Sequence, residues 1–324
     1  MSNRSEQSNE SEDSNASIDP NVVVYTADEV LRAGLVVLKY TSKRIKRAKR
    51  KTNIERFKHH FGCPPLVAAL IWEDLQTTAV PEAYLPPPKA KLQHFLMALY
   101  QLRKYPKELD RERQFDLSRN YSRDLVWFYL KKIQALKAEK IRWPDDNFGS
   151  DILAITVDGT HCWINEPQHA EWSLNSKYYS HKYGKAGVNY ELGISLSQNR
   201  LVWMNGPFPA GESDSRVFKR HGLKHHLQSK GKRGIADGGY PGYARLLSTP
   251  NNQDKPEVRR FKRRALKRHE TFNGMTKVFE CLQGRFRHGV DRFATCFEAV
   301  AVICQYMIEN GEPLYDIVVD GMFD

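Results

Sequence analysis

At Trp143-Pro144 the chain changes from helix-type to strand-type patterning, and this boundary limits the folds that it can adopt. Before it, apolar residues recur every three or four positions, as in amphipathic helices. After it come three short apolar segments bounded by Gly, Asn or Ser, at residues 152–159, 188–196 and 200–208. Three successive strands favour an antiparallel meander. We therefore expect a helical N-terminal part followed by an α/β domain.

The segment after this meander alternates between helix and strand. Residues 214–227 predict a helix, and residues 231–242 predict a short strand that ends in a Gly-rich turn. From about Pro256 to Leu282 the pattern is again helical, with an apolar face made by Phe272, Met275, Phe279 and Leu282. This order of elements is the one expected of an RNase H-like core, a mixed sheet flanked by helices, over residues 144–324.

Residues 59–143 predict a small all-α domain. Pro64 and Pro65 suit the first turn of one helix, and residues 92–102 carry the single apolar stripe of another. Ser122 is a suitable N-cap for a third helix that reaches Lys140. Short helices with a basic last member fit a helix-turn-helix DNA-binding domain, but they also fit a helical domain without that role.

The charge is unevenly distributed. The whole chain carries a formal net charge of +12, which favours a polyanionic partner such as nucleic acid. Residues 1–20 predict a disordered acidic tail, whereas residues 39–58 within the basic segment 21–58 hold ten Lys and Arg against Glu55 alone. That run is either a phosphate-binding or nuclear-import segment or the solvated face of a helix. Its candidate DNA-binding residues are Lys43, Arg44, Lys46 and Arg47.

Membrane and disulfide classes are not expected. The longest apolar stretch, Ala299–Ile308, falls short of the roughly 20 residues that cross a bilayer. The N-terminal residues lack the apolar part of a secretory signal, so we expect a reducing compartment. Five cysteines without a CxxC pair are expected to be free and mostly buried thiols.

Two aspartates follow predicted strands and precede glycine. Asp158 follows the apolar segment ILAITV, and Asp237 follows IA before the turn GGYPG. Asp before Gly is common in turns, so either residue alone is explained by a turn. Together they suggest carboxylates presented at the end of a sheet. Glu270 is a third candidate, because it shares a helix face with Asn273, Gly274 and Lys277 away from the apolar stripe. From periodicity alone, Glu270 is equally well one more solvated acid.

Three carboxylates from two strands and one helix are the oxygen ligands that a pair of hard divalent cations requires. The sequence contains no P-loop, GxSxG, HExxH or strand-linked GxGxxG motif that would favour another chemistry.

From about Phe57 onward the chain resembles the PIF/Harbinger type of transposase, in the DDE superfamily. The resemblance is carried by several ordered blocks: FKHHFGCPP with LIWEDL, FLMALYQLRKYP, ITVDGTH, GESDSRVF, IADGGYPG, RHETFNGMTKVFECLQGRFRH and FEAVAVICQYMIENG. It implies an RNase H-like nuclease domain with Asp158, Asp237 and Glu270 as catalytic, metal-binding residues. The spacings between these three acids, 79 and 33 residues, agree with the family pattern.

The resemblance implies a DNA transposase or endonuclease that cleaves and joins strands with two Mg²⁺ or Mn²⁺ ions. Double-stranded DNA, a nuclear location, a Myb-like partner protein and a homo-oligomer are the corresponding expectations. A second basic region, residues 255–292, adds Arg263, Lys267 and Lys277 as candidate DNA contacts. The alternatives are a domesticated, catalytically silent DNA-binding protein and a nuclease that acts on RNA.

For two further residues, two interpretations stay open. Asp214 lies in the shared block SDSRVF, but Asp or Ser at this point is also a good helix N-cap. His161, three residues after Asp158, either faces the substrate or has a structural role.

Overall fold

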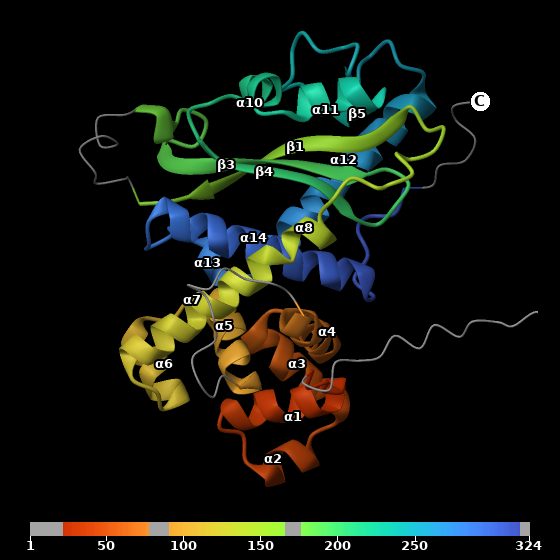
Figure 1. The fold of residues 1–324 in the computed structure, drawn as a ribbon. Helices are drawn as coiled ribbons and strands as arrows, with labels where there is room; N and C mark the ends of the chain where they lie inside the picture. Colours follow the sequence, from red (N-terminus) through yellow and green to blue (C-terminus); the bar gives the residue numbers. More distant parts are fainter. Residues whose placement is uncertain (1–21, 78–90, 166–175, 318–324) are drawn as a thin grey trace, which may run out of the picture.

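The computed structural model describes residues 22–77, 91–165 and 176–317. A mixed sheet lies at one end of the molecule and a group of N-terminal helices at the other, with a long C-terminal helix between them (Figure 1). The predicted acidic tail, residues 1–20, lies outside the described residues.

The sheet has six strands in the order β2-β3-β1-β5-β6, and β4 pairs with β3. β1 is antiparallel to β3 and β3 to β4, which confirms the predicted meander, whereas β5 and β6 extend the sheet in parallel with β1. A mixed sheet flanked by helices fits an RNase H-like core. The strands are β1 (Leu153–Trp163), β2 (Tyr179–Ser180), β3 (Lys185–Ser195), β4 (Leu201–Pro209), β5 (Arg233–Ala236) and β6 (Leu247–Ser248).

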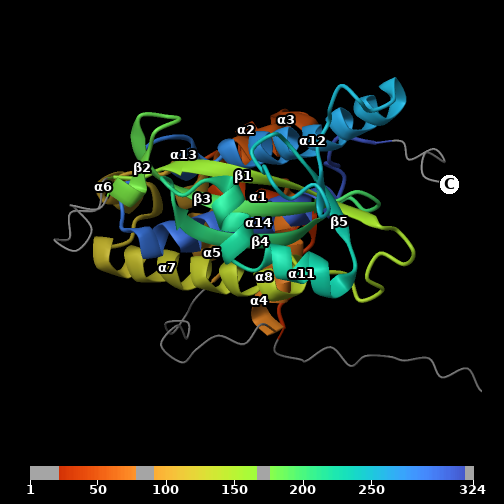
Figure 2. The same ribbon diagram turned by 90° about the horizontal axis from the view of Figure 1, so that it is seen from above.

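Helices cover both faces of this sheet (Figures 1 and 2). They are α10 (Asp214–Arg220), α11 (Leu223–Lys230), α12 (Pro256–Lys277), α13 (Glu280–Gln283) and α14 (Val290–Glu309), and a 3₁₀ turn, η2 (Ser176–Tyr178), precedes β2. The alternation of side chains in β1 explains the two layers. Ile155 and Val157 pack with Phe218 of α10, while Thr160 donates a hydrogen bond to Asn273 of α12.

The N-terminal part is entirely helical in the described ranges. Its helices are α1 (Ala27–Val37), α2 (Ser42–Arg47), α3 (Arg50–Phe61), α4 (Pro65–Thr77), α5 (Leu92–Lys104), α6 (Glu108–Phe115), α7 (Arg119–Ala135) and α8 (Lys137–Lys140). α4 begins at Pro65, as the rigid φ of proline favours in a first turn. α5 buries its predicted stripe, including Phe95 and Leu99, which confirms that helix.

Three predicted helix ends are wrong. α7 begins one turn before Ser122, with Ser118 at the N-cap, and the Ser122 hydroxyl is instead buried and donates to the carbonyl of Arg119. Gly222, at φ 108°, separates α10 from α11 within the single helix that was expected, because a left-handed φ cannot continue a right-handed helix. The helix that begins at Pro256 likewise ends at Lys277, so Glu280 belongs to α13.

One hydrophobic core joins the helical part to the sheet. α14 packs against α4 and α7 on one side and against β4 and α12 on the other. Its side chains are buried along almost the whole helix, which explains the uniformly apolar segment Ala299–Ile308. Tyr190 of β3 stacks on Phe297 of α14, with ring centroids 3.9 Å apart. The N-terminal helices and the inner face of the sheet therefore share a single core.

All five cysteines are free and buried, as predicted. Among the helices in residues 22–77, 91–165 and 176–317, none combines the length and the apolar character that a bilayer crossing requires.

Candidate active site

Asp158 and Asp237 lie next to each other in the register of the sheet. The parallel ladder between β1 and β5 ends at the pair Val157–Ala236, so each aspartate is the first residue beyond it. Asp158 does not end its strand, contrary to the sequence prediction, because β1 continues in antiparallel pairing with β3 as far as Trp163. The two carboxylates still leave the sheet at the same place.

Asp214 joins these two residues from the start of α10. Ser213 occupies the N-cap position, and Asp214 is the first residue of the helix, so the proposed capping role of Asp214 is wrong. Its carboxylate instead lies directly over Gly159, so close that a Cβ atom there would overlap Oδ1. The block SDSRVF pointed to Asp214, but a single sequence does not distinguish a helix-capping residue from a site residue.

Burial and mutual repulsion act on this aspartate cluster, which we define as Asp158, Asp214 and Asp237. Burial is the largest influence on Asp158 and, together with the charges of Asp237 and Asp214, raises its pKa to about 6. The backbone N–H of Gly159 donates to Asp158 Oδ1 at 2.8 Å and opposes this shift. Burial and the Asp237 charge likewise raise the pKa of Asp214.

Glu270 lies on α12, the helix that covers the other face of the sheet. His269 is buried, and Asn273 accepts a hydrogen bond of 2.7 Å from Thr160 of β1, so this part of the helix packs beside Asp158 in the strand. Glu270 itself is exposed, as its position off the apolar stripe predicted. Gly274 has no atom within 4 Å of an added Cβ, so the helix face next to Glu270 is open at this point.

The aspartate cluster has the chemistry of a divalent cation site. Its donors are all carboxylate oxygens, which Mg²⁺ and Mn²⁺ prefer. Gly239 keeps space beside them, because an added Cβ would stand 2.9 Å from Asp237 Oδ1 and 3.6 Å from Asp214 Oδ2. Within the described ranges no three His, Cys, Asp or Glu side chains already surround one metal position. The donor chemistry therefore fits a divalent cation, whereas the side chains do not form a complete ligand sphere in this part of the chain.

Sequence reasoning missed a fourth acid, Glu191 of β3, which pairs with Gly159 across the antiparallel ladder. Its side chain is 2% exposed, and burial, with a smaller contribution from Asp214, raises its pKa to about 8. The indole N–H of Trp203 donates to Oε2 at 3.1 Å, whereas Oε1 has no hydrogen-bond partner in the described structure. A single glutamate within an apolar strand has no sequence pattern that marks it as part of a site.

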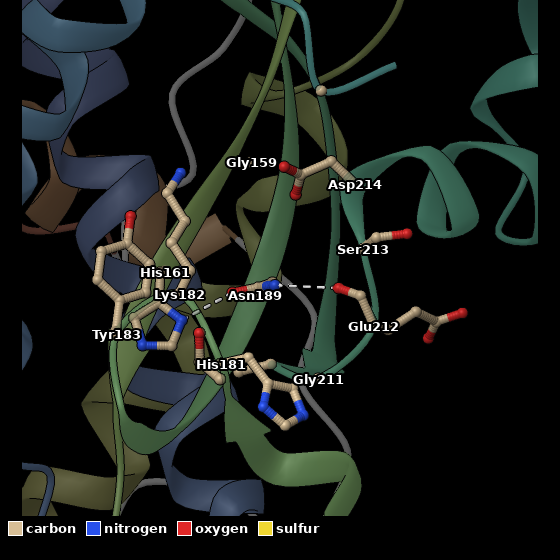
Figure 3. A pocket seen from close by; sticks show the side chains of 13 residues that line it. Gly159, His161, His181, Lys182, Tyr183, Asn189, Gly211, Glu212, Ser213 and Asp214 are labelled. Atoms are coloured by element: carbon tan, nitrogen blue, oxygen red, sulfur yellow. Dashed lines mark hydrogen bonds between the residues drawn. The ribbon is translucent and has the colours of Figure 1, made fainter. Parts of the chain in front are cut away.

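His161 lies beside the cluster and lines a pocket with residues from four segments of the chain (Figure 3). Lys182 lies at the tip of the β2–β3 hairpin. Its positive charge lowers the pKa values of Asp158 and Asp214 and so opposes the rise caused by burial and by the neighbouring aspartates. His161 lines this pocket but also stacks on Tyr183 and hydrogen-bonds to Asn189, so both interpretations of His161 stay open.

The predicted DNA-binding residues lie on two helices. Lys43, Arg44, Lys46 and Arg47 are all exposed on α2, at the end of the molecule opposite the sheet (Figure 1). Arg263, Lys267 and Lys277 are exposed on α12. The second group thus shares the helix of Glu270, while the first lies far from the aspartate cluster.

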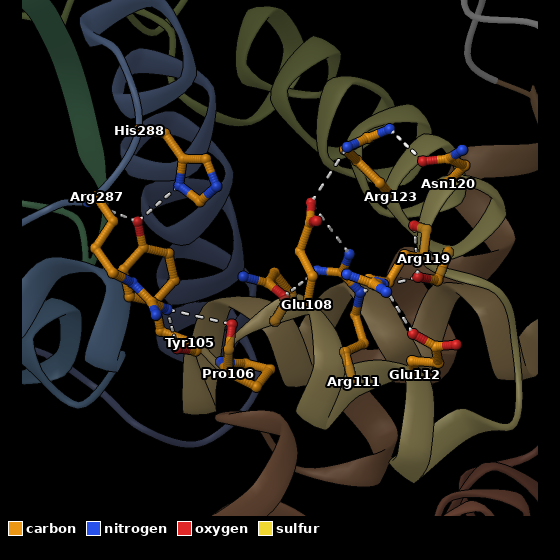
Figure 4. Close-up of polar contacts among 12 residues, drawn as sticks. Tyr105, Pro106, Glu108, Arg111, Glu112, Arg119, Asn120, Arg123, Arg287 and His288 are labelled. Atoms are coloured by element: carbon orange, nitrogen blue, oxygen red, sulfur yellow. Dashed lines mark hydrogen bonds and ion pairs between the residues drawn. The ribbon is translucent and has the colours of Figure 1, made fainter.

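The segment considered as a helix-turn-helix consists of α6, a three-residue turn and α7. Ion pairs connect the two helices: Arg119 Nε lies 3.1 Å from Glu112 Oε2, and Arg123 Nη1 lies 3.6 Å from Glu108 Oε1 (Figure 4). The apolar side of α7 packs against α5 and α14. A role of this pair in reading a DNA groove stays a prediction.

A family model described as DDE superfamily endonuclease matches residues 157–305, a range that contains Asp158, Asp214, Asp237 and Glu270. Searches of curated proteins and of solved structures gave no significant match. Endonucleases of this superfamily act on DNA and generally use divalent metals. The match therefore supports the DDE transposase superfamily for this part of the chain and indicates a transposase or nuclease function.

Proposed function

We propose that this chain is a PIF/Harbinger-type DNA transposase that cleaves and joins DNA strands. The observation that carries the proposal is the meeting of Asp158, Asp214 and Asp237 where the β1–β5 ladder ends, inside the range that matches the endonuclease family. Burial and, to a smaller extent, repulsion from Asp237 and Asp214 raise the pKa of Asp158, and a bound cation relieves such repulsion.

Two divalent cations, Mg²⁺ or Mn²⁺, would activate the attacking oxygen and stabilise the leaving oxygen of an in-line phosphodiester displacement. Asp158 and Asp237 hold the ions in this proposal, and Asp214 supplies a further carboxylate from the opposite side. Glu270, exposed on α12, completes the metal site in this proposal and orients the attacking water or 3′-hydroxyl. The chain needs no covalent intermediate of its own for this reaction.

Basic helices supply the affinity for DNA in this proposal. The exposed residues of α2 bind phosphates of duplex DNA away from the cut, while Arg263, Lys267 and Lys277 of α12 bind phosphates closer to it. Action on chromosomal DNA further implies a nuclear location, and we include a Myb-like partner protein and a homo-oligomer as parts of the same proposal.

The decisive experiment is a cleavage assay with matched DNA and RNA duplexes in Mg²⁺, using the wild type, Asp158→Asn and Asp237→Asn. We expect metal-dependent nicking of DNA by the wild type and none by either variant, because each loses a ligand charge. Asp151→Asn, an exposed aspartate two residues before β1, is the matched control and should keep wild-type activity.

The alternatives give different results in the same assay. A catalytically silent DNA-binding protein would bind the duplex but leave it intact in every sample. An RNA nuclease would cut only the RNA duplex. Nicking by both asparagine variants would show that the site has been assigned to the wrong residues.

A further inference from the structure

A cavity of about 320 Å³ lies beside the aspartate cluster, between the β2–β3 hairpin and the loop that leads into α10 (Figure 3). Gly159, Gly239 and Asp214 belong both to its lining and to the surroundings of the cluster. The cavity is at the small end of ligand pockets, so it takes one nucleotide rather than a base pair. Anything bound in it lies next to the aspartate cluster.

An aromatic pair forms one wall of this cavity. The rings of His161 and Tyr183 stack with their centroids 4.4 Å apart and an interplanar angle of 22°. Tyr183 is 45% exposed, so part of its ring is open to solvent. A planar aromatic surface beside an opening is the platform on which a nucleobase stacks.

The hydrogen bonds of Asn189 assign the tautomer of His161. The Asn189 amide NH₂ donates to the carbonyl of Glu212 at 3.5 Å, which leaves its oxygen to accept from His161 Nδ1 at 3.0 Å. Burial lowers the pKa of His161, which favours the neutral form of the ring. In that form Nε2 is an acceptor, but it is buried against Gly187 without a hydrogen-bond partner in the described structure, so the ring serves here as a fixed support for Tyr183.

Charge determines which part of a nucleotide enters. Glu212 and Asp214 line the cavity and disfavour a phosphate inside it. Lys182 lies at the rim, with its ammonium group 5.4 Å from the Tyr183 ring centroid, and the Tyr183 oxygen, then Asp214 and Asp237, raise its pKa. A neutral base fits the interior, and the phosphate fits the position beside Lys182.

We propose that this cavity binds one unpaired nucleotide of the DNA substrate, with its base stacked against the exposed side of Tyr183. The inference rests on the proposed function, because it places that base next to the phosphate to be cut. It adds that the substrate is opened locally at the site. An unpaired base leaves the helix at lower cost than a paired one.

The test measures binding of the full chain to two short DNA duplexes in EDTA, by fluorescence anisotropy. One duplex is fully paired, and the other carries a single unpaired adenine. We expect the wild type to prefer the second by about tenfold, as base–aromatic stacking provides. Tyr183→Leu should remove this preference.

Tyr179→Leu is the matched control, because Tyr179 is 46% exposed in the same hairpin but does not line the cavity. It should keep the tenfold preference. Equal binding of the two duplexes by the wild type, or equal loss in both tyrosine variants, would overturn the proposal. Tyr183→Phe, which keeps the ring, should behave as the wild type and shows that loss of folding is not the cause.

Because every binding measurement is made without metal, it is independent of the cleavage assay. Absent cleavage contradicts the proposed function, whereas an absent preference contradicts only the pocket.

Discussion

The carboxylate of Asp214 occupies the space directly above the α-carbon of Gly159, one residue after Asp158. Glycine is therefore required at position 159 for a reason that the strand itself does not impose. It lets α10 bring a third carboxylate to a place where β1 and β5 already supply two.

Gly159→Ala tests this contact. The added Cβ overlaps Asp214 Oδ1, so the Asp214 side chain must leave its position over residue 159. We expect loss of metal-dependent cleavage by at least an order of magnitude, with retained DNA binding and a cooperative thermal transition. Gly284→Ala is the control, because its Cβ meets no atom within 4 Å, and it should keep activity. Equal activities would show that the position of Asp214 does not matter.

Glu270→Gln tests the acid that the structure places on α12. The side chain is exposed, so we expect the free energy of unfolding to change by no more than about 0.5 kcal/mol and DNA binding to persist. Cleavage should fall by orders of magnitude. Both quantities are measured on the same preparation, by thermal melting and by nicking in Mg²⁺.

Glu257→Gln is the matched control for that substitution. Glu257 is exposed in the first turn of the same helix, about 20 Å along the axis from Glu270. It should leave cleavage unchanged. Glu280 is unsuitable, because it belongs to α13 and lies 3.7 Å from Arg103 and 3.6 Å from Lys104. Similar losses in the Glu257 and Glu270 variants would remove Glu270 from the site.

Neutralising the four basic residues of α2, Lys43, Arg44, Lys46 and Arg47, should weaken binding to all DNA sequences alike. The logarithmic salt dependence should flatten by up to about 0.9 for each lost phosphate contact. Titrations at several salt concentrations measure both effects. Arg50→Gln should have a smaller effect, because Arg50 already pairs with Asp28 at 2.8 Å. Unchanged affinity together with loss of nuclear location would make α2 an import signal instead.

Glu191→Gln should change how stability depends on pH. The pKa of Glu191 is raised from 4.5 to about 8, chiefly by burial, so the folded state retains a proton that the unfolded state releases. That contribution to stability is fully present below about pH 4.5 and is lost as pH rises through about 8. The glutamine variant does not lose stability in this way. Its melting temperature relative to that of the wild type should therefore rise from pH 5 to pH 8. An advantage that does not vary with pH would contradict the buried, protonated acid.

The sequence predicted local structure well where one signal dominated. The apolar stripe from Leu92 to Leu102 predicted α5, and the three apolar segments after Trp143 predicted β1, β3 and β4. It was wrong where two local signals competed. Ser118 and Ser122 are both good caps, and the helix starts at the first because a left-handed residue, Asp116, ends α6 just before it.

The sequence by itself determined that Asp158 and Asp237 follow apolar strands and precede glycine, because that pattern depends only on neighbouring residues. Only the tertiary structure decided that β1 and β5 are parallel neighbours, which brings these two acids together. It also decided that Asp214 lies over Gly159 and that Tyr183 and His161 form one wall. These contacts join residues far apart in the chain, and they depend on strand order and side-chain direction, which no local pattern encodes.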